Sequence, residues 1–154
     1  MGIIFCKLYR GRNIIKPLKD DIIEKGYVSK EDATNPETMK GICDGAEVVI
    51  TTVGLTGAST KVTSYDIDYK GNMNLYEECE RAGVKKFNYI SVISCDEKGA
   101  EEVPMLHAKF LVEEEIKKQE MDWVIYRPTG YFYDIAKVFK PYVDKGEMQL
   151  LKGY

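Results

Sequence analysis

Apolar residues along the chain gather into short, nearly continuous runs that alternate with stretches of helical spacing. The runs predict buried strands at residues 1–8, 46–53, 85–90 and 122–126. A long helix is predicted over residues 64–82, where four large side chains recur every three or four positions: Tyr65, Tyr69, Met73 and Tyr76. Strands that alternate with helices favour an α/β fold with a parallel sheet and right-handed crossovers.

Capping residues and glycines predict where the helices begin and end. Asn35 and Pro36 suit the N-cap and the first position of a helix that runs to about residue 44, and Gly83 suits the end of the long helix. Pro104 opens a further helix, whose apolar residues alternate with charged ones such as Glu113. Weaker patterns predict helices at 13–21 and 131–143 and strands at 24–29 and 148–151.

Composition narrows the class of protein. A chain of 154 residues with 44% hydrophobic content is sufficient for one domain with one core. The net charge of -3, with both signs interspersed, gives no basic stripe and argues against a nucleic-acid partner. No apolar run approaches the roughly 20 residues that span a bilayer. Four cysteines without C-x-x-C spacing and a single histidine predict a reduced, metal-free, cytoplasmic protein.

Small and polar residues follow three of the predicted strands. Gly54 ends the second, Ser91 follows the third, and Arg127 to Gly130 follow the fourth. Ligands of an open parallel sheet bind outside the carboxyl ends of its strands, so the candidate chemistry is expected at these exits.

Several motifs occur together in one order: Asp32-Ala33-Thr34, the run from Asp44 to Gly54, Gly71-Asn72-Met73-Asn74-Leu75, the run from Gly83 to Phe87, Ser91, Lys109 and Arg127-Pro128-Thr129-Gly130. In this combination the chain resembles the atypical short-chain dehydrogenase/reductases, and most of all their NmrA-like, NAD(P)-binding branch. The resemblance implies a Rossmann-like, doubly wound parallel sheet, here a single partial domain over residues 1–154. It also implies NADP or NAD as the cofactor.

The resemblance assigns cofactor contacts residue by residue. It places Asp32 and Ala33 beside the adenine and the strand exit Thr52-Val53-Gly54 under the adenosine ribose. It places Pro128, Thr129 and Gly130 near the nicotinamide ring. A carboxylate can accept a hydrogen bond from the adenine amino group, and glycine permits close approach of the backbone. The alternative is that Asp32 caps local backbone and that Gly54 only turns the chain.

Lys109 resembles the lysine of the family's Tyr-x-x-x-Lys pair, which holds the nicotinamide ribose. The tyrosine of that pair would fall at Met105, whose thioether has no proton to donate. His107 lies about 200° around the helix from Lys109 and is expected to face away from the site. Tyr131 and Tyr133 follow the last strand and are alternative donors, although packing roles suit them better. Lys109 itself could pair with Glu113 instead of a ligand.

Both ends of the chain depart from the family pattern. No G-x-x-G-x-x-G loop occurs before Asp32, and the run at 1–8 resembles the family's second strand, so the first strand and the phosphate loop are expected to be absent. Weaker dinucleotide affinity is expected from this loss. Unpaired sheet edges are expected too, and a second copy of the chain could cover one of them. The chain resembles a fragment truncated at both ends, and its small-molecule substrate is unknown.

Three functions remain open on the sequence. The first is an NAD(P)-dependent oxidoreductase with a degenerate active site, in which Lys109 and Ser91 would be the catalytic residues. The second is a non-catalytic, dinucleotide-sensing module that a partner protein reads. The third is an inactive fragment. Arg10 and Arg12 could meet a 2′-phosphate, which favours NADP slightly over NAD.

Overall fold

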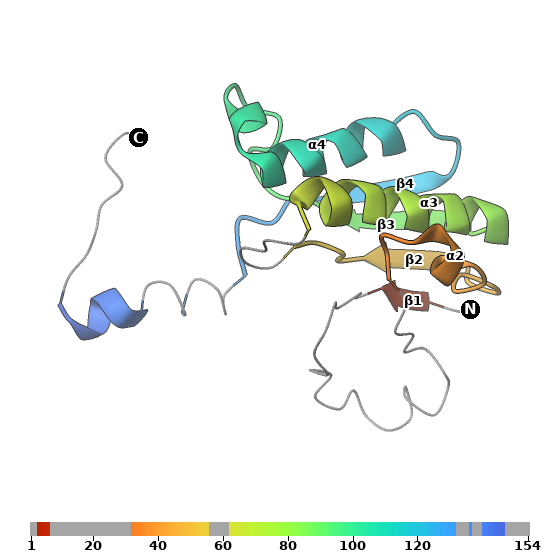
Figure 1. Ribbon diagram of the computed structural model, residues 1–154, viewed down its shortest axis with the longest axis horizontal. Coiled ribbons are helices and arrows are strands. Elements are labelled where there is room, and N and C mark those ends of the chain that lie inside the picture. The colour runs from red at the N-terminus through yellow and green to blue at the C-terminus, as the bar shows by residue number, and fades with distance from the viewer. Residues whose placement is uncertain (1–2, 7–31, 56–61, 132–135, 137–139, 147–154) are drawn as a thin grey trace.

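The computed structural model describes residues 3–6, 32–55, 62–131, 136 and 140–146. Four parallel strands form one sheet in the order β1-β2-β3-β4 (Figure 1). Their bounds are β1 Ile3–Cys6, β2 Val48–Thr51, β3 Lys86–Ile90 and β4 Asp122–Tyr126. The register pairs Cys6 with Thr51, Thr51 with Tyr89 and Tyr89 with Ile125, so the carboxyl ends of all four strands lie at one edge of the sheet.

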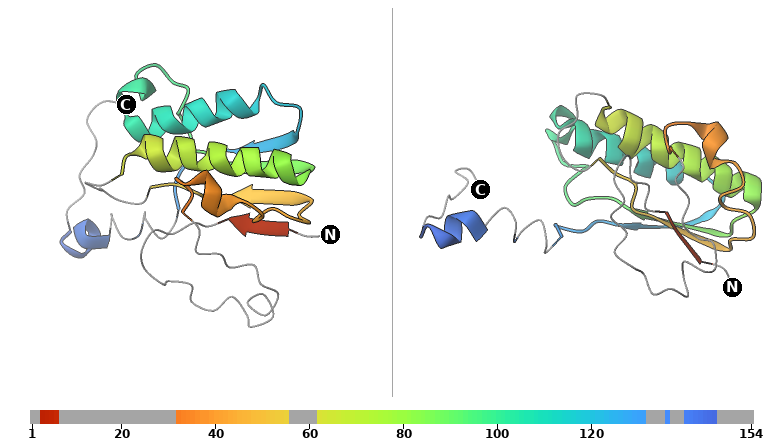
Figure 2. Two further views of the ribbon diagram at one scale, coloured as in Figure 1. Left: turned by 45° about the vertical axis from the view of Figure 1, so that its right-hand side comes forward. Right: turned by 60° about the horizontal axis from the view of Figure 1, so that its bottom comes forward.

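Helical segments connect the strands on one face of the sheet. They are α2 Pro36–Met39, the π-helical segment η1 Tyr65–Lys70, α3 Gly71–Ala82, the short 3-10 helix η2 Ala100–Glu102 and α4 Pro104–Ile116. Figure 2 shows α2, α3 and α4 on the same side of the strands. A strand order without reversal places successive right-handed connections on one face. The described residues therefore form one half of a doubly wound sheet, and the predicted α/β fold with a parallel sheet is confirmed.

Most of the predicted helix ends are confirmed. The side chain of Asn35 accepts a hydrogen bond from the Glu37 N–H, with Pro36 in the first turn. Gly83 adopts φ 72° and its N–H bonds to carbonyls of the last turn of α3. The prediction of a helix to about residue 44 is wrong, because α2 ends at Met39. Gly41, at φ +90°, and Gly45, at φ +76°, hold the following turns in left-handed conformations that break a helix.

The core lies between the sheet and the helices α3 and α4. β3 is at its centre, with Phe87, Asn88 and Tyr89 all buried. The rings of Tyr76 and Phe87 meet edge to face at 5.1 Å between centroids, a favourable arrangement for two buried aromatic rings.

Three of the four large side chains of the predicted stripe pack on the core: Tyr76 is buried, and Tyr69 and Met73 are partly buried against it, whereas Tyr65 is exposed. The buried side of the helix also includes Asp68, Asn72 and Cys79. An aspartate and an asparagine look solvent-facing in the sequence. They are buried here because each has polar partners in the neighbouring strand exit, described below.

β1 fills the position directly beside β2. The unpaired edge expected from the loss of the family's first strand is therefore not at β2, which pairs with β1 on one side and β3 on the other.

Some of the weaker predictions concern the two ends of the chain. The predicted elements at 13–21, 24–29 and 148–151 lie outside the described residues. Of the predicted helix at 131–143, positions 136 and 140–143 are helical, and the helix continues to position 144. No helix among the described residues is long and apolar enough to cross a bilayer.

Candidate site at the carboxyl ends of the strands

The exits of β3 and β4 are hydrogen-bonded to each other. The Ser91 N–H donates to the Tyr126 carbonyl at 2.8 Å, and the Ile93 N–H donates to the Pro128 carbonyl at 3.0 Å. The two segments that follow β3 and β4 therefore stay side by side for several residues beyond the last strand pair. This brings the predicted segments at Ser91 and at Pro128 to Gly130 together.

Lys109 links the exits of β2 and β3. Its Nζ lies 3.3 Å from Asp68 Oδ1 and 3.4 Å from the Ile90 carbonyl oxygen, at the end of β3. It also lies 5.5 Å from the centre of the Tyr89 ring. A Cβ added to Gly54 would stand 3.4 Å from the same Nζ. One ammonium group thus lies where two strand exits meet, and the alternative pairing of Lys109 with Glu113 is wrong.

Asp68 and Asn72 hold the exit of β2 in place. The Leu55 N–H donates to Asp68 Oδ2 at 3.1 Å. One helical turn later, Asn72 accepts from the Thr51 hydroxyl at 2.8 Å and donates to the carbonyls of Val53 and Asp68. Every polar atom of the buried Asn72 side chain is therefore used. Val53 is a buried packing residue with an engaged carbonyl, whereas Thr52 is exposed at the edge.

Asp32 and Ala33 lie against the same end of the sheet. Ala33 is buried, its carbonyl accepts from Asn74 Nδ2 at 2.7 Å, and a Cβ on Gly71 would come within 3.1 Å of its Cβ. Gly71 thus lets this turn approach the start of α3. The carboxylate of Asp32 accepts from the N–H and the hydroxyl of Thr34, which is the local capping role considered as the alternative.

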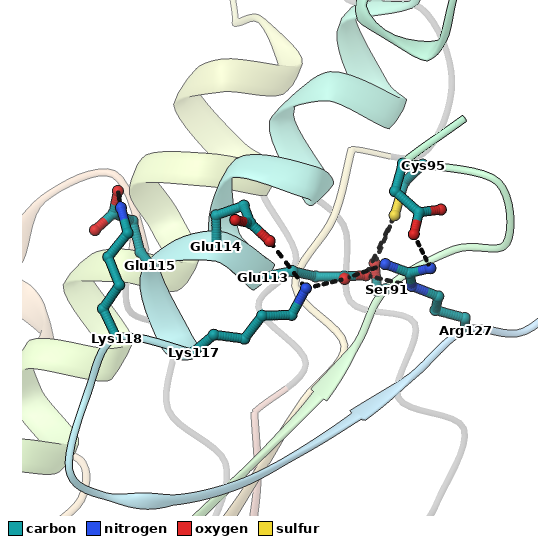
Figure 3. A network of polar contacts seen from close by, with 9 residues as sticks. Ser91, Cys95, Glu113, Glu114, Glu115, Lys117, Lys118 and Arg127 are labelled. Carbon is teal, nitrogen blue, oxygen red and sulfur yellow. Dashed lines mark hydrogen bonds and ion pairs between the residues drawn. The ribbon is translucent and has the colours of Figure 1, made fainter. Parts of the chain in front are cut away.

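A second polar cluster lies under the exits of β3 and β4 (Figure 3). Its centre is Glu113, which is almost fully buried on α4. Arg127 donates to both of its carboxylate oxygens, at 2.9 and 2.6 Å, and also to Asp96 at 2.6 Å. The Cys95 thiol donates to Glu113 at 3.2 Å and lies 3.7 Å from the Ser91 hydroxyl. Ser91 is buried and directed into this cluster.

The cluster keeps Glu113 ionised. Burial alone would raise its pKa, but hydrogen bonds from Arg127, Ser91 and Cys95 hold the pKa below its ordinary value. For the Cys95 thiol, burial and the hydrogen bond to Glu113 raise the pKa, so the sulfur stays protonated and donates. This thiol is accordingly a poor nucleophile.

The described residues offer no clear replacement for the proton donor missing at Met105. Met105 lies on the first turn of α4 and is partly exposed. His107 contacts η1, as Lys109 does, and its Nδ1 lies 2.9 Å from the Tyr65 hydroxyl. The prediction that it faces away from the side of Lys109 is therefore not confirmed. Tyr89 is next to Lys109, but burial raises its pKa well above the ordinary value, the reverse of what a proton donor needs. Tyr131 is exposed, and Tyr133 lies outside the described residues.

Comparison with known proteins gives the family. The model of the NAD(P)H-binding family matches residues 17–147, most of the chain. The chain belongs to this family. The resemblance to the NmrA-like, atypical short-chain dehydrogenase/reductases is thereby confirmed, and NAD(P)H is the cofactor class of the NAD(P)H-binding family.

Two curated relatives are photosystem II assembly factors named Ycf39. The one from Cyanophora paradoxa is 23% identical over 127 residues, covering 80% of this chain and 39% of that protein. The one from Synechocystis sp. is 26% identical over 96 residues, covering 62% and 28%. The chain thus spans well under half the length of both relatives.

Solved structures confirm the fold. A nucleoside-diphosphate-sugar epimerase from Staphylococcus aureus superposes with a TM-score of 0.61 at 20% identity, over 93% of this chain and 45% of the other. The NADPH-dependent quinone oxidoreductase of Escherichia coli, complexed with NADPH, gives 0.57 at 13% identity, over 82% and 42%. Both belong with the Rossmann-like proteins that the sequence predicted.

Sequence reasoning missed Asp68, Asn72, Glu113 and Asp96. The available signal was the spacing Asp68-x-x-x-Asn72, which places two polar side chains on one face of a helix beside a strand exit. For Glu113, the signal was a carboxylate one residue after the apolar Val112, on a helix that follows Ser91 and precedes Arg127. Neither sequence pattern shows which residues these side chains would bond to, because those partners become neighbours only in the folded structure.

Gly54 tests this geometry directly. A Cβ at this position would stand 3.0 Å from Asp68 Oδ1, which is closer than nine in ten of the contacts that Cβ atoms make in proteins. Gly54→Ala is expected to push the Asp68 carboxylate away from Lys109 and to lower the free energy of unfolding by about 1 to 2 kcal/mol. Urea denaturation measures this, with the exposed neighbour Thr52→Ala as the control. An unchanged stability would show that the buried pair tolerates the extra methyl group.

Proposed function

We propose that the chain binds an NAD(P)H dinucleotide across the carboxyl ends of β2, β3 and β4. The observation that carries the proposal is the position of the Lys109 ammonium, held where the exits of β2 and β3 meet. Ligands of open parallel sheets bind outside these ends, and an ammonium there can donate to a ribose hydroxyl.

The arrangement of the other site residues supports a direction for the ligand. Asp32 and Ala33 lie near the β2 exit, where the adenosine half would bind, with the exposed Thr52 and Gly54 beneath its ribose. Thr129 and Gly130 are exposed at the β4 exit, where the nicotinamide would lie beside Pro128. The Asp32 carboxylate, which accepts hydrogen bonds within the Thr34 turn, would also accept from the adenine amino group.

Calorimetric titration of the chain with NADPH and NADH tests the proposal. With no glycine-rich loop recognised in the sequence, we expect saturable one-to-one binding with a Kd on the order of 10 μM, tighter for NADPH than for NADH. The preference for NADPH rests on Arg10 and Arg12, which lie outside the described residues. Absence of saturation for both nucleotides up to millimolar concentration would overturn the proposal.

Met105 favours a second function, binding without turnover. In a non-catalytic sensing module the bound dinucleotide shifts the population of one conformation, which a partner protein reads. We expect the wild-type chain to bind NADPH without oxidising it in the presence of a quinone. Met105→Tyr restores a hydroxyl four positions before Lys109, on the same helix face. Oxidation by the wild-type chain, followed as loss of NADPH absorbance, would instead support the oxidoreductase.

Several further features belong to the same proposal. In an active oxidoreductase Ser91 would hydrogen-bond the substrate or the nicotinamide amide, for which its hydroxyl would have to leave Cys95. The residues 1–154 would act as one domain in the cytoplasm, where Cys43, Cys79 and Cys95, none of which forms a disulfide, stay reduced. A second copy would pair along an outer edge of the sheet, and no nucleic acid or membrane would take part.

A further inference from the structure

The most unusual part of the site is the pair formed by Asp68 and Lys109. Asp68 lies in the π-helical segment η1, a rare conformation that often marks functional sites. Its side chain is 1% exposed and that of Lys109 is 12% exposed. A lysine whose only task is solubility would extend into water, so the burial of this ammonium needs a cause.

The surroundings of Asp68 supply that cause. Oδ2 accepts from the Leu55 N–H, which fixes the carboxylate against the exit of β2. Oδ1 lies 3.3 Å from Lys109 Nζ and has no hydrogen bond with good geometry among the described residues, so the pair is held by charge more than by direction. Burial raises the pKa of Asp68, whereas Lys109 and the hydrogen bond from Leu55 lower it. The ionised carboxylate is therefore unfavourable in this buried position unless the Lys109 ammonium lies beside it.

The surroundings of Lys109 point the same way. An ammonium has three N–H donors. Lys109 Nζ donates to the Ile90 carbonyl at 3.4 Å and lies 3.3 Å from Asp68 Oδ1, to which it is held by charge. Among the described residues these two contacts leave the ammonium with donor capacity for a ligand. Gly54 leaves the space beside Nζ open, because a side chain there would contact both charged groups.

We propose that Asp68 is a positioning residue that holds the Lys109 ammonium at the junction of the β2 and β3 exits, so that its remaining N–H meets the nicotinamide-side ribose. This rests on the proposed binding of NAD(P)H. Asp68 itself does not touch the ligand. It acts on the ligand only through Lys109, and the hydrogen bond from the Leu55 N–H holds its carboxylate in place.

The test compares Asp68→Asn with the wild-type chain for two ligands. NADPH has the nicotinamide-side ribose, whereas adenosine 2′,5′-bisphosphate carries only the adenine half. We expect the Kd for NADPH to rise about tenfold and the Kd for the adenine half to change less than twofold. An equal loss for both ligands, or no loss for either, would overturn the proposal, because a merely structural residue would affect the two halves alike.

A double-mutant cycle adds a readout that holds if Asp68→Asn folds poorly. Lys109→Met and Asp68→Asn/Lys109→Met both lack the ammonium, and the double variant has no unpaired buried charge. If Asp68 acts through Lys109, the two variants bind NADPH with the same Kd. A further loss of affinity in the double variant would overturn the proposal.

A chemical readout separates this inference from the binding proposal itself. Limited acetylation of the ligand-free protein, followed by peptide mass spectrometry, measures how accessible Lys109 is relative to the exposed Lys118 and Lys140. We expect Lys109 to react several times faster in Asp68→Asn than in the wild type. An unchanged rate would overturn the positioning role. Failure of wild-type NADPH binding alone would overturn the proposed function and leave the acetylation result to decide the role of Asp68.

Discussion

Replacing Arg127 with methionine is expected to lower the free energy of unfolding by about 3 kcal/mol. Arg127 donates to both carboxylate oxygens of Glu113, whose side chain is 1% exposed. The variant leaves a buried carboxylate with only Cys95, Ser91 and the more distant Lys117 near it, while the methionine retains much of the packing. Chemical denaturation at neutral pH measures the loss.

Lys118→Met is the matched control for this variant. Lys118 lies just after α4 and pairs with Glu115 at 3.0 Å on the exposed surface. Exposed pairs of this kind contribute about 0 to 1 kcal/mol, so little change is expected. Equal effects of Arg127→Met and Lys118→Met would contradict the assignment of Arg127 and Glu113 as a buried, coupled pair.

The pH dependence of the same variant has a definite sign. In the wild type the pKa of Glu113 lies below its ordinary value of 4.5, so its contribution to stability is present above pH 4.5 and is lost as the pH falls through the lowered value. In Arg127→Met the pKa of Glu113 is expected to rise above 4.5. The variant then gains stability relative to the wild type as the pH is lowered from neutral, and the difference between them narrows. A constant difference down to pH 4 would contradict this.

Lys109→Met is expected to weaken NADPH binding by about thirtyfold. A hydrogen bond from a charged donor contributes about 2 kcal/mol, and the methionine cannot donate. Asp68 loses its cation at the same time, so some loss of thermal stability is expected as well. Calorimetric titration gives the Kd, and Lys118→Met controls for the loss of one positive charge. Unchanged NADPH affinity in a folded Lys109→Met variant would remove Lys109 from the binding site.

The elements that position the site could be predicted because their signals are local. Continuous β-branched runs marked β2 and its neighbours, and Gly83 and Asn35 marked helix ends through their own backbone preferences. The exits at Gly54, Ser91 and Pro128 were placed at one edge because parallel strands share their carboxyl side. Lys109 was found by resemblance and lies at that edge.

The residues that support the site could not be predicted in the same way. Asp68, Asn72 and Glu113 are polar and fit the exposed side of an amphipathic helix when only the sequence is known. Their burial is favourable solely because partners distant in sequence satisfy them: Leu55 and Thr51 for the first two, and Arg127 for Glu113. Periodicity reports which side chains are apolar, and it carries no information about such pairings.

A dinucleotide bound at the carboxyl edge of this sheet would change the surroundings of the strand exits. Two-dimensional amide NMR of the isotope-labelled chain, titrated with NADPH, measures this residue by residue. We expect the largest chemical-shift changes in the amides of Gly54, Leu55, Ser91 and Gly130, with Gly45, Gly83 and Met121 at the opposite edge unchanged. Chemical-shift changes confined to the opposite edge, or none at millimolar NADPH, would show that the dinucleotide does not bind at the strand exits.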